Sequence, residues 1–128
     1  MATCYYSVQN MACPLFLPSA PLAGFSDLYG GECAIPGESI PEDTLRHGCN
    51  AGYARALCKR AAQSDADAFR FAIKANRDAA VDVAWSSERN HHPVAVGMLT
   101  ILPDAADSSP LERQARVYAD AYLRQIGA

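Results

Sequence analysis

The chain has 128 residues and a mass of 13.7 kDa, enough for one domain with a single core and too little for two ordinary domains. Half of its residues are hydrophobic, 20% are charged and the net charge is −3, a composition typical of a soluble globular protein and without the basic excess of nucleic-acid-binding proteins. No run approaches 18 apolar residues and the first residues lack the pattern of a signal peptide, so we expect no membrane span and a cytoplasmic location.

The first 40 residues contain no Lys or Arg and show no sustained hydrophobic period. They hold four of the eight prolines, which are Pro14, Pro18, Pro21 and Pro36. Because proline fixes φ and lacks an N–H group, it disfavours regular hydrogen-bonded structure. We therefore expect an ordered segment made mostly of loops and turns, with a turn at Gly30-Gly31 that delivers Cys33.

Residues 41–62 have a helical pattern. Pro41, followed by Glu42 and Asp43, suits the first turn of a helix, and apolar residues then follow at helical spacing. Gly48 and Gly52 weaken this prediction, because each glycine costs about 1 kcal/mol relative to alanine inside a helix. These glycines either divide the segment into two short helices or allow another backbone to come close.

From Phe69 onward the hydrophobic period changes to two. Segments 69–74 and 81–86 alternate between apolar and polar residues and are separated by a turn at 76–78. A second turn at 90–93 leads into the apolar segment 94–102. The pattern predicts a three-stranded antiparallel meander.

The C-terminal segment carries a clear helix start signal. Ser109 is placed as an N-cap, Pro110 as the first helical residue and Glu112 as the glutamate of a capping box. A single apolar stripe follows, formed by Leu111, Ala115, Tyr118, Tyr122 and Ile126. We expect this helix to pack on the sheet.

Together these elements predict an α+β fold in one domain, residues 1–128. A Cys-rich loop and helix half, residues 1–63, packs on the three-stranded antiparallel sheet and the C-terminal helix of residues 64–128.

All five cysteines lie in the first 58 residues, at Cys4, Cys13, Cys33, Cys49 and Cys58. Their odd number and the lack of an export signal favour reduced thiols over a disulfide framework. Reduced cysteines serve as metal ligands, as catalytic groups or simply as small buried residues. Random use in the core would also place some of them in the second half, so their confinement supports a shared metal or cluster site.

The spacing of Cys13, Cys33, Cys49 and Cys58 bears on the kind of metal. The intervening stretches of 19, 15 and 8 residues contain no Cys-x2-Cys pair, which disfavours a zinc finger, ribbon or knuckle. An iron–sulfur cluster can be held from separate loops and tolerates wider spacing. We therefore expect these four cysteines to ligate a 4Fe-4S cluster, although the spacing matches no established signature. Cys4 is left over, and His47 could replace a thiol in a mixed site.

Residues beside the cysteines fit this interpretation. Pro14 follows Cys13, and glycines flank Cys33 and Cys49, where they would let backbone N–H groups approach sulfur. The first basic residues of the chain include Arg46, Arg55, Lys59 and Arg60. Because four thiolates leave a cluster with excess negative charge, we predict that Arg46, Arg55 and Lys59 lie close to it.

The function expected from the sequence is a small cytoplasmic cluster-binding protein that acts in electron transfer, redox sensing or structural stapling, with a protein or redox partner and without nucleic acid or membrane. Four protein ligands close a metal site, which suits these roles better than catalysis, so we do not expect an enzyme. Two alternatives stay open. One is a structural zinc domain that serves as an interaction module, and the other is a metal-free binding protein or thiol enzyme with core cysteines.

Overall fold

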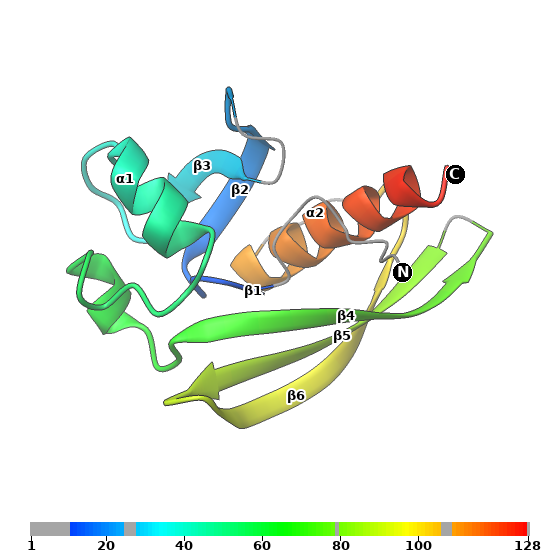
Figure 1. The fold of residues 1–128 in the computed structure, drawn as a ribbon. Coiled ribbons are helices and arrows are strands. Elements are labelled where there is room, and N and C mark those ends of the chain that lie inside the picture. Colours follow the sequence, from blue (N-terminus) through cyan, green and yellow to red (C-terminus); the bar gives the residue numbers. More distant parts are fainter. Residues whose placement is uncertain (1–10, 25–27, 79, 106–108, 128) are drawn as a thin grey trace, which may run out of the picture.

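A computed structural model describes residues 11–24, 28–78, 80–105 and 109–127. Its larger sheet has four antiparallel strands in the order β1-β4-β5-β6 (Figure 1). The strands are β1 (Met11–Ala12), β4 (Ala68–Arg77), β5 (Ala80–Arg89) and β6 (His92–Ile101). The α+β class and the three strands of the meander are confirmed, but the predicted strand number is wrong. The two-residue strand β1 pairs with β4 and is too short to show a period of two.

A second sheet replaces part of the predicted loops. It consists of β2 (Phe16–Pro21) and β3 (Tyr29–Cys33), which pair antiparallel. Two of the prolines lie in β2 without preventing this pairing, because each strand of a two-stranded sheet has one unpaired edge. Gly31 allows the strands to come close, since a Cβ at this position would lie 2.1 Å from the carbonyl oxygen of Leu17.

Segment 41–62, whose helical pattern was weakened by Gly48 and Gly52, does not form one continuous helix. Short helical pieces form instead: α1 (Glu42–Thr44), a π-helix η1 (Leu45–Cys49) and a 3₁₀ helix η2 (Arg60–Gln63), with turns between η1 and η2. Gly52 explains the break. Its φ is +79°, and a Cβ there would lie 2.7 Å from the Cβ of Ala68. This glycine therefore ends the helical path and lets the chain approach β4.

The C-terminal helix α2 (Pro110–Gln125) covers one face of the larger sheet (Figure 1). The predicted cap is confirmed, because the backbone N–H of Glu112 donates to the Ser109 hydroxyl oxygen at 3.2 Å. The helix also contacts β2. Its apolar face packs against the sheet in a core that includes Phe71, Val81, Val83, Ala115, Tyr118 and Ala119.

A second core lies among β2, β3 and the short helices. Its buried members are Cys13, Phe16, Tyr29, Leu45, Cys49, Ala54 and Ala61. Two of the cysteines expected to bind metal are therefore part of the apolar core of the N-terminal half.

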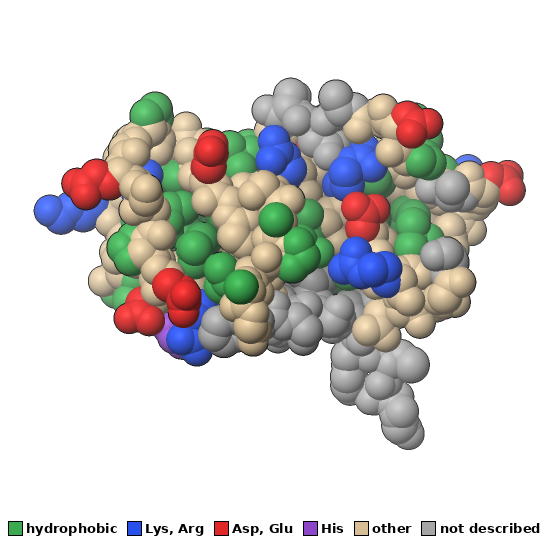
Figure 2. Space-filling model, turned by 90° about the horizontal axis from the view of Figure 1, so that it is seen from above, with side chains coloured by type: hydrophobic (Ala, Val, Ile, Leu, Met, Phe, Trp, Pro, Cys, Tyr) green, Lys and Arg blue, Asp and Glu red, His purple; other side chains and the backbone are tan. Residues whose placement is uncertain are grey.

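The edge strand β6 carries exposed apolar side chains at Val94, Val96 and Met98. The first five residues of β6 are all exposed, and of the described residues of this strand Leu99 and Ile101 pack at the α2-covered core. The face of the molecule in Figure 2 shows acidic and basic side chains interspersed among apolar ones.

Among the described residues, α2 and the shorter helices lack the length and hydropathy needed to cross a bilayer.

Candidate metal centre

Four cysteines from four separate segments meet at one cavity. Cys13 follows β1, Cys33 ends β3, Cys49 ends η1, and Cys58 lies two residues before η2. We call Cys13, Cys33, Cys49 and Cys58 the cysteine set. The cysteine cavity is the space that this set lines together with Leu15, Phe16, Ile40, Ala54, Arg60 and Ala61. Residues far apart in the sequence are thus brought to one place in the fold.

The cysteine cavity is narrow and mainly apolar. About 320 Å³ around it is not filled by atoms, but this space includes open solvent, and the interior has room for about one water-sized sphere. Cys13 and Cys49 are buried, with 6% and 8% exposure, and Cys33 and Cys58 are half-buried. As they stand, the described residues do not place three or more His, Cys, Asp or Glu side chains so that they could hold one metal ion. Metal binding would therefore require the thiol side chains to move.

Cys13 is held from two sides. Its backbone N–H donates to the carbonyl oxygen of Cys49 at 3.0 Å. From α2, the amide nitrogen of Gln114 donates to the carbonyl oxygens of Cys13 and Phe16, both at 2.8 Å. Gln114 is only 4% exposed. The C-terminal helix therefore fixes the turn that carries the first cysteine.

Asn50 fixes the segment that carries the third cysteine. Its side-chain amide accepts from the backbone N–H of Tyr29 at 2.9 Å and donates to the carbonyl oxygens of Tyr29 and Leu45, both at 2.8 Å. The side chain is buried and follows Cys49 directly. It therefore joins the end of η1 to β3, the strand that ends at Cys33.

Backbone hydrogen bonds hold the other two cysteines. The N–H of Ile35 lies 3.4 Å from the Cys33 sulfur and donates to it. The N–H of Cys58 donates to the carbonyl oxygen of Ala54 at 2.9 Å, and the Cys58 carbonyl accepts from Ala61. An N–H group directed at sulfur is the kind of contact that stabilises a thiolate in a metal site.

Burial controls the protonation of the two innermost thiols. Desolvation, together with smaller contributions from charge repulsion by the other members of the cysteine set, raises the pKa of Cys49 to about 12. Desolvation likewise raises the pKa of Cys13, against a smaller lowering by the backbone N–H of Leu15. Both groups are neutral thiols near pH 7 without metal, which makes them poor nucleophiles.

The basic residues of segment 46–60 differ in how near they lie to the cysteine cavity. Arg60 lines the cysteine cavity and its charge lowers the pKa of Cys49, whereas Arg46, Arg55 and Lys59 are not among the residues described as lining it. Arg55 still lies close enough for its charge to lower the pKa of Cys13. His47 is exposed, and Cys4 lies outside the described residues.

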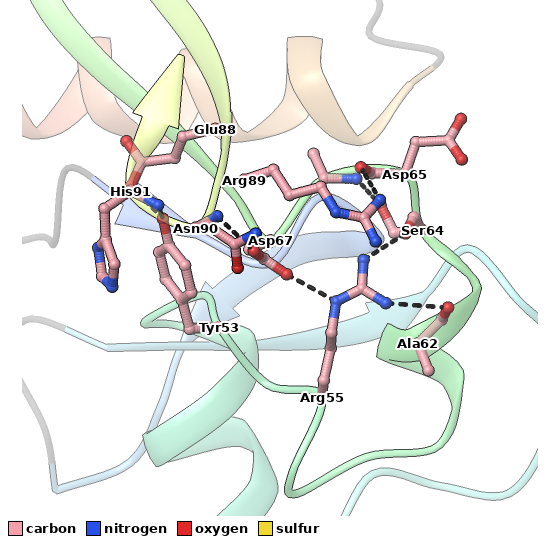
Figure 3. Close-up of polar contacts among 11 residues, drawn as sticks. Tyr53, Arg55, Ala62, Ser64, Asp65, Asp67, Glu88, Arg89, Asn90 and His91 are labelled. Carbon is pink, nitrogen blue, oxygen red and sulfur yellow. Dashed lines mark hydrogen bonds and ion pairs between the residues drawn. The ribbon is translucent and has the colours of Figure 1, made fainter. Parts of the chain in front are cut away.

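Arg55 belongs to a polar network that joins the cysteine-bearing turn to the sheet (Figure 3). Its guanidinium Nε pairs with Asp67 at 2.6 Å, and its other nitrogens donate to the carbonyl oxygens of Ala62 and Ser64. Asp67 also accepts from the backbone N–H of Asn90 at 2.9 Å. This network ties the segment on both sides of Cys58 to the turn between β5 and β6.

Tyr53 makes the second link in this network. Its hydroxyl donates to Glu88 at 2.6 Å and accepts from the backbone N–H of His91, and its ring stacks on the His91 ring with centroids 4.5 Å apart (Figure 3). Glu88 also pairs with Arg70 at 2.9 Å. Tyr53, Asn90 and His91 all have positive φ values, so these contacts hold the backbone in sparsely populated conformations.

Sequence patterns did not identify Gln114 and Asn50 as positioning residues. The helical period places Gln114, a polar residue, among apolar ones. This position was the sequence feature that could have indicated a buried polar role. Asn50 follows a glycine and a cysteine and reads as an ordinary turn residue. The sequence matches no family model, and no similar curated protein or solved structure was found.

Proposed function

We propose that the protein binds a 4Fe-4S cluster through Cys13, Cys33, Cys49 and Cys58. The observation that carries this proposal is the meeting of the four side chains, from four segments, at the cysteine cavity. Four cysteine thiolates are the usual ligand set of such a cluster. When bound, the cluster would supply a one-electron redox centre and a covalent link among the four segments.

The wide spacing of the four cysteines along the sequence favours a cluster over a single zinc ion. In a zinc site all four sulfurs must lie about 2.3 Å from one ion, so they must come very close together. In a cluster each cysteine binds a different iron atom, and the ligands stay further apart. Because the interior of the cysteine cavity has room for about one water-sized sphere, either group would require the thiols to move, and a cluster would also require the cavity to widen. A structural zinc site is an alternative outcome of the same metal analysis.

Binding would require the buried thiols to lose their protons. Since burial raises the pKa of Cys13 and Cys49, thiolate formation there is unfavourable without a cation to compensate the charge. Metal loading should thus release protons and should weaken as the pH falls. Arg60 is the positive side chain at the cavity wall and would offset part of the negative charge.

One observation favours a second function. Cys13 and Cys49 pack in an apolar core with Phe16, Tyr29 and Leu45, as small buried residues would in a metal-free binding protein. The raised pKa of both thiols argues against their use as catalytic nucleophiles. The metal-free alternative is therefore a structural or binding role.

The test is purification without oxygen, followed by an absorption spectrum and by iron, sulfide and zinc assays. The proposal expects a brown protein with broad absorption near ~400 nm and both iron and acid-labile sulfide. Colourless protein with zinc supports the zinc domain. Folded, colourless protein without either metal, whose fold does not change with a chelator, supports the metal-free alternative.

A further inference from the structure

A second, more open cavity adjoins the cysteine cavity. It is lined by residues of segment 31–40 and by Arg60, with about 860 Å³ of unfilled space that includes open solvent. Cys33, Ile40 and Arg60 line both cavities and so form the wall between them. Cys33 is therefore the member of the cysteine set that this open cavity reaches.

Arg60 binds the segment that borders this cavity at two points. Its Nη1 donates to the carbonyl oxygen of Ile35 at 3.2 Å, and its Nη2 donates to the carbonyl oxygen of Glu38 at 2.9 Å. The guanidinium also lies against Gly37, where an added Cβ would be 3.1 Å from Nη1. One side chain from η2 thus ties down segment 35–38.

The tied segment also contacts the sulfur. Ile35 accepts from Arg60 through its carbonyl oxygen and donates to the Cys33 sulfur through its N–H. We propose that Arg60 is a positioning residue that holds segment 35–38 over Cys33 and limits the access of solvent and reagents to this sulfur. The inference deepens the proposed cluster site and rests on that proposal for its role, which is to protect the ligand that the open cavity reaches.

The first test needs no metal. The metal-free protein is treated with iodoacetamide under native conditions, and the labelling rate of each cysteine is followed by mass spectrometry. Arg60→Ala should raise the rate at Cys33 by about 3- to 10-fold, the effect of losing two partly exposed hydrogen bonds from a charged donor. The rates at Cys13 and Cys49 should not rise, because loss of the Arg60 charge raises the pKa of Cys49 further. Arg55→Ala is the comparison variant, because it removes a guanidinium bound to two carbonyls and to Asp67 but should not act selectively on Cys33.

A second variant keeps the test decisive if Arg60→Ala does not fold. Gly37→Ala retains the positive charge, and its added methyl group would force the guanidinium to shift by a few tenths of an ångström, so it should also accelerate labelling at Cys33 selectively, by less than Arg60→Ala does. The proposal is overturned if Cys33 reacts at the wild-type rate in every variant that folds. It is equally overturned if all the cysteines react faster together, because the contact would then act on general stability.

A second measurement links the tether to the cluster. If iron is bound, the absorption near ~400 nm should decay faster in air in Arg60→Ala than in wild type. A wild-type protein that binds no iron would reject the proposed function, while the labelling experiment would still decide whether Arg60 shields Cys33. Iron binding combined with unchanged labelling would instead reject the tether and leave the cluster in place.

Discussion

The backbone N–H of Cys13 donates to the carbonyl oxygen of Cys49 at 3.0 Å, although 35 residues separate them in the chain. This bond joins the turn after β1 to the end of η1 and sets the two most buried thiols of the cysteine set beside each other. Because the bond joins backbone atoms, it fixes the backbone positions of the two cysteines. It leaves their side chains able to rotate toward a metal.

Replacing Cys49 should remove most of the bound metal. In Cys49→Ser the thiolate is lost at a buried position, and we expect roughly half or less of the wild-type iron, with lower stability of the N-terminal half. Iron analysis and thermal unfolding measure both effects. The same substitution at Cys4 is the matched control and should be milder. Equal losses at both positions would show that the cysteine set is not the ligand set, and unchanged iron in Cys49→Ser would reject its role.

Without metal, the protein should lose stability in alkali. Burial raises the pKa of Cys49 from its ordinary value of 9.0 to about 12, so above pH 9 the unfolded chain releases this proton while the folded chain keeps it. The unfolded state then binds fewer protons, and the free energy of unfolding falls as the pH rises from about 9 to about 12. Urea unfolding at about pH 8 and about pH 10.5 measures this slope. Cys49→Ser should show a shallower fall than wild type, and equal slopes would contradict the assignment.

Gln114 should be needed for the position of Cys13. Gln114→Met keeps the size of the side chain but removes its two hydrogen bonds to carbonyl oxygens. The Cys13 carbonyl retains a bond from the N–H of Phe16, so the expected loss is about 1–3 kcal/mol in the free energy of unfolding. Arg113→Met is the matched control, since Arg113 makes one partly buried bond to Pro18 from the same helix. Its effect should be below about 1 kcal/mol, and a larger effect than that of Gln114→Met would contradict this account.

Asp67 should make the link between the cysteine-bearing turn and the sheet sensitive to acid. Its hydrogen bond from Arg55, and then that from the Asn90 N–H, lower the pKa of the carboxyl from its ordinary 3.8. The folded state is therefore favoured above pH 3.8, and this contribution is lost as the pH falls through the lowered value.

The variant Asp67→Asn tests this dependence. It keeps the shape of the side chain but cannot carry the charge, so it should be less stable than wild type at neutral pH and should lose less stability on acidification. Urea unfolding at about pH 7 and about pH 3 compares the two proteins. Glu88→Gln provides a second case, because Arg70 and Tyr53 lower the pKa of Glu88. A parallel pH dependence of Asp67→Asn and wild type would be evidence against the link.

Elements with a strong local signal could be predicted from the sequence. The start of α2 depends on Ser109, Pro110 and Glu112, which are adjacent in the chain, and the period of two over β4 and β5 reflects one buried face. The strands β2 and β3 lacked such a signal, because prolines and glycines occupy positions where a pairing strand usually has β-branched residues. In the structure β2 packs against α2, and Phe16 and Tyr29 share a core with residues of η1.

The candidate site was predictable only as a set of residue types. Side chains far away in the chain help to bring the cysteine set together. Gln114 acts on Cys13 from about 100 residues away, and no local pattern encodes that contact. The role of Arg60 likewise depends on where segment 35–38 lies in space, which the spacing of basic residues does not reveal.

The most direct test of the central claim is the amount of iron and acid-labile sulfide bound per folded chain after anaerobic reconstitution. Wild type should bind about four of each, and a variant with all members of the cysteine set changed to serine should bind almost none. Folded wild-type protein that binds neither, or that binds one zinc ion and no sulfide, would contradict the proposal that these four thiols hold a 4Fe-4S cluster.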